Sequence, residues 1–144
     1  MKHPSCGVLS CCQRKNLGYC HQCNEFPCEK YDGADQVDSF ISHKNQLKDS
    51  NKAKNIGMDA YAKELNEKIS ILETLLKNYD DGRRKSFFCA ALNLLELQDV
   101  RDVATQIEFE GCLEQPIKAR AARAVQLLQA VADKHGISLK PRKK

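Results

Sequence analysis

Residues 58–79, MDAYAKELNEKISILETLLKNY, carry the strongest periodic pattern in the chain. The large apolar side chains follow one another at steps of 4, 4, 3, 4 and 3 residues: Tyr61, Leu65, Ile69, Leu72, Leu76 and Tyr79. Side chains three or four residues apart lie on one face of an α-helix. We therefore predict a long helix whose apolar face belongs to a core or to the surface of a partner helix.

Four further helices are predicted around this one, with glycines between them at positions that suit turns and C-caps. The first runs from residue 34 to about residue 54, with apolar support from Val37, Phe40, Ile41 and Leu47. The others cover residues 84 to about 97, residues 99–107 and residues 116–135. Asp99 is the expected N-cap of the third, and Pro116 suits the first turn of the last. The charged tail from Leu139 onward is expected not to pack.

The fold class predicted from these patterns is mostly α: a bundle of about five helices (residues 34–144) preceded by a small cysteine-rich module (residues 1–33). The chain has 144 residues, 42% of them hydrophobic and 29% charged, as in ordinary single-domain proteins. It contains no apolar run of about 18 residues, so we expect no membrane partner. Its start shows no apolar signal segment.

The number and position of the cysteines are the most informative feature of the sequence for function. Six of the eight cysteines lie within the first 28 residues: Cys6, Cys11, Cys12, Cys20, Cys23 and Cys28. Secreted disulfide scaffolds instead spread their cysteines along the whole chain that they cross-link. We therefore expect a reducing, cytoplasmic location, where clustered thiols indicate metal ligands before disulfides.

The spacing of the clustered cysteines favours zinc. Cys20 and Cys23 form a C-x2-C pair that can chelate one ion from a single turn, and zinc takes four such ligands at about 2.3 Å. The second pair could come from Cys6 with either Cys11 or Cys12. The nearby cations Arg14, Lys15 and Lys30 could offset the charge of the thiolates.

Six thiols exceed the needs of one tetrahedral ion, so alternatives stay open. An iron–sulfur or two-metal cluster is one, although the tight C-x2-C-x2-C run typical of such clusters is absent. Free or disulfide-forming thiols are another. His21 could replace one ligand, and Cys20 with Cys23 could form a redox dithiol. Cys89 and Cys112, far along the chain, are expected to be core side chains.

At this point the chain resembles a known family. Residues 6–11 (CGVLSC) and 20–30 (CHQCNEFPCEK) resemble the cysteine signature of a prokaryotic family catalogued as domain of unknown function 3795. Residues 81–89 (DGRRKSFFC) and 93–95 (NLL) are similar to the helical half of its longer members. The resemblance implies metal binding without an established activity. The metal-ligand candidates that match by position are Cys6, Cys11, Cys20, Cys23 and Cys28, with Cys12 as the less regular alternate.

Many members of that family carry a further cysteine set upstream, which is missing here. A site that needs those upstream ligands would be incomplete in this chain.

Positive charge is concentrated in residues 83–144, which carry twelve basic and seven acidic side chains, net +5. Within them, Arg83, Arg84 and Lys85 are a candidate anion-binding cluster, although cations at a helix N-terminus oppose the helix dipole. A second basic group could contact nucleic acid: Arg120, Arg123 and Lys134 with Lys140, Arg142, Lys143 and Lys144 of the tail. The alternative for both groups is an ordinary solvated surface that binds neither an anion nor nucleic acid.

No paired carboxylates, P-loop, HExxH or GxSxG motif occurs, so the sequence favours a protein that is not an enzyme. The leading hypothesis is a cytoplasmic protein with a structural zinc ion and helices that bind a protein partner. The alternative is a zinc-dependent nucleic-acid-binding or regulatory protein that uses the basic C-terminal part. A redox or iron–sulfur protein is the weakest of the three.

Overall fold

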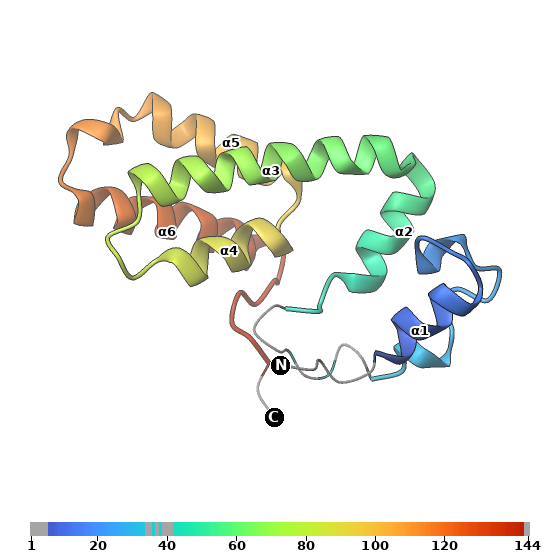
Figure 1. The fold of residues 1–144 in the computed structure, drawn as a ribbon. Coiled ribbons are helices and arrows are strands. Elements are labelled where there is room, and N and C mark those ends of the chain that lie inside the picture. Colours follow the sequence, from blue (N-terminus) through green and yellow to red (C-terminus); the bar gives the residue numbers. More distant parts are fainter. Residues whose placement is uncertain (1–5, 34–35, 37, 39–41, 143–144) are drawn as a thin grey trace.

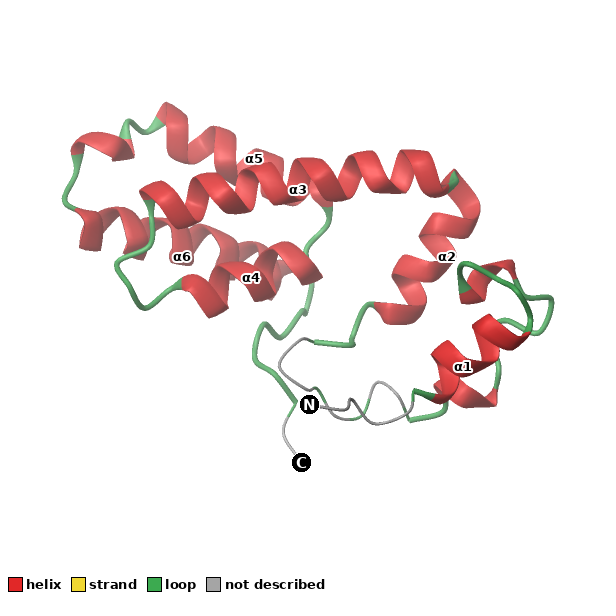
Figure 2. Ribbon diagram, in the orientation of Figure 1, coloured by secondary structure: helices red, strands yellow, loops and turns green. Residues whose placement is uncertain are grey.

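The computed structural model describes residues 6–33, 36, 38 and 42–142, and it confirms a mostly α-helical protein. These described residues form six α-helices and three short 3-10 helices, without any strand (Figures 1 and 2). Nowhere in this part of the chain is a helix both long and apolar enough to cross a membrane. In chain order the elements are α1 (Gly7–Arg14), η1 (Cys20–Gln22), η2 (Glu29–Tyr31), α2 (Gln46–Ile56), α3 (Met58–Asn78), α4 (Lys85–Leu94), α5 (Leu97–Phe109), η3 (Cys112–Glu114) and α6 (Ile117–Lys134).

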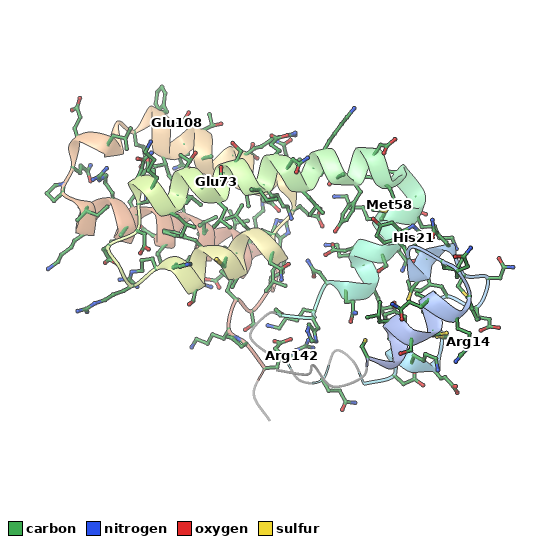
Figure 3. All side chains as sticks on the ribbon, in the orientation of Figure 1. Arg14, His21, Met58, Glu73, Glu108 and Arg142 are labelled. Carbon is green, nitrogen blue, oxygen red and sulfur yellow. The ribbon has the colours of Figure 1, made fainter. Side chains whose placement is uncertain are left out.

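Helices α3 to α6 pack into one bundle, in which α3 contacts the other three helices (Figure 1). The apolar faces of the four helices meet in one buried cluster, and side chains fill the space between the ribbons (Figure 3). Alanines let α6 approach its neighbours closely, since Ala121, Ala124 and Ala132 are fully buried. The large members of the cluster are Leu75, Tyr79, Phe88, Leu92, Leu94, Leu95, Leu97, Val100, Val103, Ile107, Leu128 and Leu139.

The apolar face of α3 is buried only at its C-terminal end. Leu75 and Tyr79 are buried in the bundle, whereas Leu65 is 39% and Ile69 51% exposed. The N-terminal half of α3 extends past the bundle towards α2 (Figure 1). The predicted helix is therefore confirmed, but its core-facing side differs from the predicted stripe. Of the stripe residues only Tyr79 is buried, Leu72 and Leu76 are partly buried against the core cluster, and the buried Leu75 lies off the stripe.

Helix α2 begins later than the sequence pattern predicts. Residues 42–45 precede it in a non-helical conformation, so the expected helix from residue 34 to about residue 54 is wrong at its N-terminal end. Three of its supporting residues, Val37, Phe40 and Ile41, lie outside the described residues. The physical reason lies at Asp38, whose buried carboxylate accepts hydrogen bonds from the His43 backbone N–H (2.9 Å) and the Ser42 hydroxyl (3.3 Å). These bonds hold residues 42 and 43 outside the helix.

Ion pairs tie α2 to the bundle. Glu96, at the start of α5, pairs with Lys48 (2.5 Å) and Lys52 (3.1 Å) of α2, and Lys52 also pairs with Glu64 of α3 (2.5 Å). The hydrogen bond from Lys48, followed by the one from Lys52, lowers the pKa of Glu96 to about 2. On its other side α2 contacts η1, so it links the cysteine-rich module to the bundle.

Two helix starts differ from the predictions by a few residues. Helix α5 has Glu96 as its N-cap, and Asp99 lies inside the first turn, because the extended backbone at Leu95 ends α4 earlier than expected. Pro116 is the N-cap of α6 and does not lie in its first turn. Both shifts leave the number and order of the predicted helices intact.

The C-terminal segment packs against the rest of the protein, contrary to the expectation of a free tail. Leu139 is 7% exposed and belongs to the core cluster. The Lys44 ammonium donates hydrogen bonds to the carbonyls of Ser138 (2.5 Å) and Lys140 (2.9 Å). Arg142 pairs with Asp38, so the segment joins the loop before α2 (Figure 3). One apolar anchor and several hydrogen bonds therefore hold residues 138–142 against the rest of the protein.

Candidate metal centre

Short helices and turns bring distant cysteines together in the N-terminal module. Residues 1–33 show no periodicity, which predicts loops and short turns. Residues 7–14 instead form the helix α1, which places Cys11 and Cys12 side by side. Cys20 opens η1, and the Cys23 N–H closes that turn on the Cys20 carbonyl (2.9 Å). Cys28 is the N-cap of η2. Three separate backbone segments thus supply thiols to one region.

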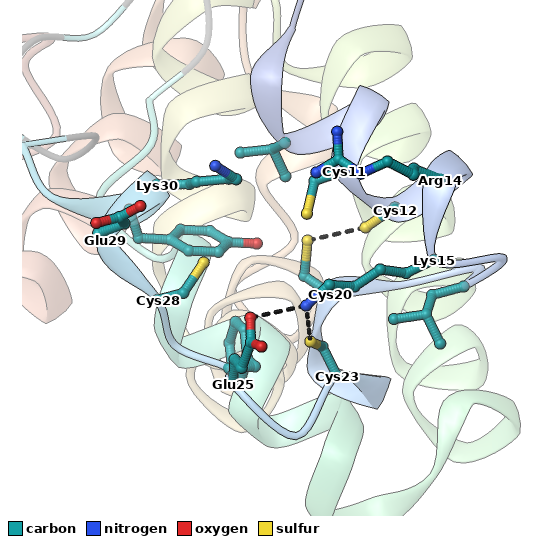
Figure 4. Close-up of a pocket in the computed structure, with 14 residues that line it drawn as sticks. Cys11, Cys12, Arg14, Lys15, Cys20, Cys23, Glu25, Cys28, Glu29 and Lys30 are labelled. Carbon is teal, nitrogen blue, oxygen red and sulfur yellow. Dashed lines mark hydrogen bonds and ion pairs between the residues drawn. The ribbon is translucent and has the colours of Figure 1, made fainter.

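These five thiols line one pocket of about 480 Å³ (Figure 4). The predicted ligands Cys11, Cys20, Cys23 and Cys28 and the alternate Cys12 are all at its wall. Cys6 is different, because it is the exposed N-cap of α1 and does not line the pocket. The structure therefore brings together five of the six clustered cysteines.

Cys12 and Cys20 are in direct contact, with their sulfur atoms 3.1 Å apart. The hydrogen bond to Cys20, then burial and the nearby thiols, raise the pKa of Cys12 to about 11. Either sulfur can be the donor of this hydrogen bond.

Tyr31 forms a buried wall of the pocket. Its side chain is 8% exposed and packs edge-on against Phe26, with ring centroids 5.5 Å apart. Burial, and next the hydrogen bond to Cys20, raise the pKa of the Tyr31 hydroxyl above its usual range. The hydroxyl therefore stays protonated and donates to the Cys20 sulfur. Sequence reasoning missed Tyr31 and Phe26, although both lie within or just after the cysteine cluster.

Lys15 supplies positive charge at the opposite wall. Its ammonium lies 3.3 Å from the Cys23 sulfur and 2.7 Å from the Glu25 carboxylate (Figure 4). The hydrogen bonds to Glu25 and to Cys23 raise the pKa of Lys15, and the Lys15 ammonium lowers the pKa of Glu25. Arg14 and Lys30 line the same pocket. All three cations expected to offset thiolate charge are therefore close to the thiols.

The donor set fits a soft metal, but its arrangement is not that of a closed metal site. Thiolates that share a tetrahedral zinc ion lie about 3.8 Å apart, from Zn–S bonds of about 2.3 Å. Cys12 and Cys20 are closer than that, as a hydrogen-bonded pair is. In the described part of the chain, no three His, Cys, Asp or Glu side chains are arranged to hold a metal ion. Metal binding at these thiols stays a prediction.

The remaining predicted residues lie away from the pocket. His21 stacks on Tyr19, with ring centroids 5.5 Å apart, and does not line the pocket. Cys89 is exposed on α4, so the expectation that it packs in the core is wrong. Its neighbour Phe88 takes the core-facing position instead. The side chain of Cys112 is outside the described part of the structure.

The candidate anion cluster lies at the start of α4, where Arg84 is the N-cap and Lys85 the first helical residue. The Asp80 carboxylate accepts a hydrogen bond from the Arg84 N–H (2.9 Å), and the Asp81 carboxylate accepts one from the Arg83 N–H (3.1 Å). The Arg84 side chain lies 3.7 Å from the Asp81 carboxylate. Arg83, Arg84 and Lys85 therefore have two carboxylates beside them, and their binding of an anion stays a prediction.

Comparison with known proteins gives a family match in the module. The model of a family described as a protein of unknown function (DUF3795) matches residues 1–33. The resemblance drawn from the cysteine signature is thereby confirmed over these residues, while the resemblance of residues 81–95 stays a prediction. No curated protein and no solved structure matches the chain. The family description names no activity, so the function has to be argued from the site.

Proposed function

We propose that the cysteine-rich module binds one zinc ion through thiolates and that this ion has a structural role. The observation that carries the proposal is the pocket lined by thiols from three separate backbone segments. Cys11, Cys20, Cys23 and Cys28 are the proposed ligands. A zinc ion held by them would cross-link α1, η1 and the start of η2, and its binding free energy would act as folding free energy for these short elements. Because thiols bind metal only in the reduced state, the proposal includes a reducing compartment such as the cytoplasm.

The neighbours of the thiols have supporting roles in this proposal. Lys15 compensates part of the negative charge of a four-thiolate site through its contact with Cys23. Tyr31 holds the Cys20 sulfur in place through its hydroxyl. Groups that hydrogen-bond a metal ligand orient it and tune its affinity. Cys12 is left as a fifth thiol beside Cys20.

Elemental analysis of anaerobically purified protein tests the proposal. We expect a zinc-to-chain ratio near one in the wild type and loss of the metal in the Cys20→Ser/Cys23→Ser double variant. The matched controls are Cys89→Ser, which changes an exposed thiol on α4, and Cys6→Ser, which changes the clustered thiol outside the pocket. Both controls should keep the metal. Full zinc retention in the double variant contradicts the proposal, and visible absorbance with bound iron would favour an iron–sulfur cluster instead.

We also propose that the helical bundle binds a protein partner. The support is a set of exposed apolar side chains between α5 and α6, where Phe109 is 91%, Leu113 54% and Ile117 36% exposed. Exposed apolar clusters are typical of interaction sites. Affinity capture with wild type and with Phe109→Asp tests this surface. A partner that binds the wild type and not the variant supports it, and identical capture by both contradicts it.

A further inference from the structure

Cys12 and Cys20 form a thiol pair poised for a covalent link. Their sulfurs are 3.1 Å apart, and a disulfide bond needs about 2.05 Å, so an approach of about 1 Å is enough. In the described part of the module, no other pair of pocket thiols is hydrogen-bonded. Cys23 instead has the Lys15 ammonium against its sulfur.

The two residues also occupy distinct places in the proposed metal site. Cys20 is a proposed ligand, whereas Cys12 is the surplus fifth thiol in contact with it. A disulfide between them would remove one of four ligands and leave three. Thiolate ligation and a Cys12–Cys20 disulfide therefore exclude one another.

We propose that Cys12 and Cys20 are a peroxide-oxidised pair whose disulfide displaces the metal ion. In the first step, hydrogen peroxide oxidises one thiol to a sulfenic acid and releases one water molecule. In the second, the other thiol attacks that sulfur, the S–S bond forms, and the sulfenic oxygen leaves as a second water molecule. Two thiols are thus oxidised by two electrons in total, and one peroxide is reduced. The metal-release part rests on the proposed function, whereas the disulfide itself does not.

Peptide mapping combined with single-cysteine variants identifies the pair, because the peptide with Cys12 and the peptide with Cys20 each carry three cysteines. Trypsin cuts after Lys2, Arg14, Lys15 and Lys30, so Cys12 falls in the peptide of residues 3–14 and Cys20 in the peptide of residues 16–30. After peroxide treatment of reduced, metal-free protein and blocking of the remaining thiols, we expect these two peptides to be joined. The link should be lost in Cys12→Ser and in Cys20→Ser, and kept in Cys11→Ser, which changes the neighbouring thiol on the same helix.

Zinc release gives the second readout, followed with a chromogenic chelator on zinc-loaded protein. Cys12→Ser keeps all four proposed ligands, so it should load zinc as the wild type does. It should then retain zinc at a peroxide concentration that empties the wild type, and Cys12→Ala should behave in the same way.

The outcomes separate the two proposals. Unlinked peptides, a link that survives in Cys12→Ser, or equal zinc release from wild type and Cys12→Ser would overturn the redox inference while metal binding stands. Failure of every form to load zinc would overturn the metal proposal and the metal-release step, and the peptide map would then decide on the disulfide alone.

Discussion

Replacing Asp38 with alanine removes a hydrogen-bond acceptor that joins the segment before α2 to the C-terminal segment. The carboxylate is fully buried and accepts hydrogen bonds from the backbone N–H groups of His43 (2.9 Å) and Arg142 (2.8 Å). It also accepts bonds from the Ser42 hydroxyl (3.3 Å) and the Arg142 guanidinium (3.1 Å). With alanine at this position, these donors must form hydrogen bonds with water or remain without an acceptor.

The expected cost is about 3 kcal/mol in the free energy of unfolding. Removing one partner of a buried charged pair costs roughly 3–5 kcal/mol, and a hydrogen bond to a charged group contributes roughly 1.5–3 kcal/mol. The low end applies because the Arg142 side chain is 29% exposed and regains some hydration. The loss should appear in global unfolding, because the adjacent Leu139 is anchored in the core cluster.

Urea denaturation followed by far-ultraviolet circular dichroism measures this effect. The matched control is Asp32→Ala, which changes an exposed loop aspartate and should leave the stability unchanged. A loss smaller than about 1 kcal/mol in Asp38→Ala, within the range of one ordinary hydrogen bond, would refute the reasoning.

The same carboxylate predicts a pH dependence. Burial alone would raise the pKa of Asp38, but the hydrogen bonds from the Arg142 backbone and guanidinium and from the His43 N–H outweigh it and hold this pKa well below its usual value. A carboxylate with a lowered folded-state pKa stabilises the protein above its unfolded value of about 3.9, and this contribution is lost as the pH falls further. The stability difference between wild type and Asp38→Asn should therefore shrink below about pH 4. A constant difference down to acid denaturation would contradict this assignment.

Three further predictions concern the bundle and its turns. Phe88→Ala should lower the free energy of unfolding by about 3–5 kcal/mol, because Phe88 is fully buried, and Phe87→Ala should cost clearly less because Phe87 is only partly buried. Gly82→Ala should lower the free energy of unfolding by about 1–2 kcal/mol, because Gly82 has a φ of +89°. No atom lies within 4 Å of an added Cβ, so the loss would come from the backbone conformation alone. Gly7 is equally open but has no positive φ, so Gly7→Ala should not lower the free energy of unfolding. Both pairs can be compared by urea denaturation. Metal removal by a chelator should leave most of the helical circular dichroism, because the core cluster contains no residue of the module; loss of most of that signal would mean one cooperative unit.

Long, regularly spaced elements were predictable because helix formation depends on local spacing. Residues 58–79 form α3 almost to the residue, and the glycines before and after it have positive φ, as C-cap and turn glycines do. Periodicity alone does not place Cys89. Successive residues point about 100° apart around a helix, and on α4 both members of the pair Ala91 and Leu92 are buried whereas only Phe88 of the pair Phe88 and Cys89 is buried.

Short and non-local features could not be predicted in this way. Helix α1 has only eight residues and no buried side chain, so its apolar face is too short to be recognised from spacing. The loop at Asp38 depends on Arg142, which is 104 residues away in the sequence. Cys28 joins the thiol pocket, and Cys6 stays outside it, through the packing of three backbone segments. Spacing alone predicts which residues could bind a metal, and packing decides which of them meet.

Charge counting from the sequence overstates the positive field of the C-terminal part. Arg123 forms two hydrogen bonds with Glu110, at 2.7 and 2.5 Å, and Arg101 is paired in the same bidentate way with Glu67 of α3. Arg142 pairs with the buried Asp38. Each of these arginines neutralises a carboxylate of this chain, so it contributes less to attraction of a phosphate backbone than an isolated cation would. The carboxylate partners come partly from outside residues 83–144, which explains why a local net charge of +5 does not by itself define a nucleic-acid surface.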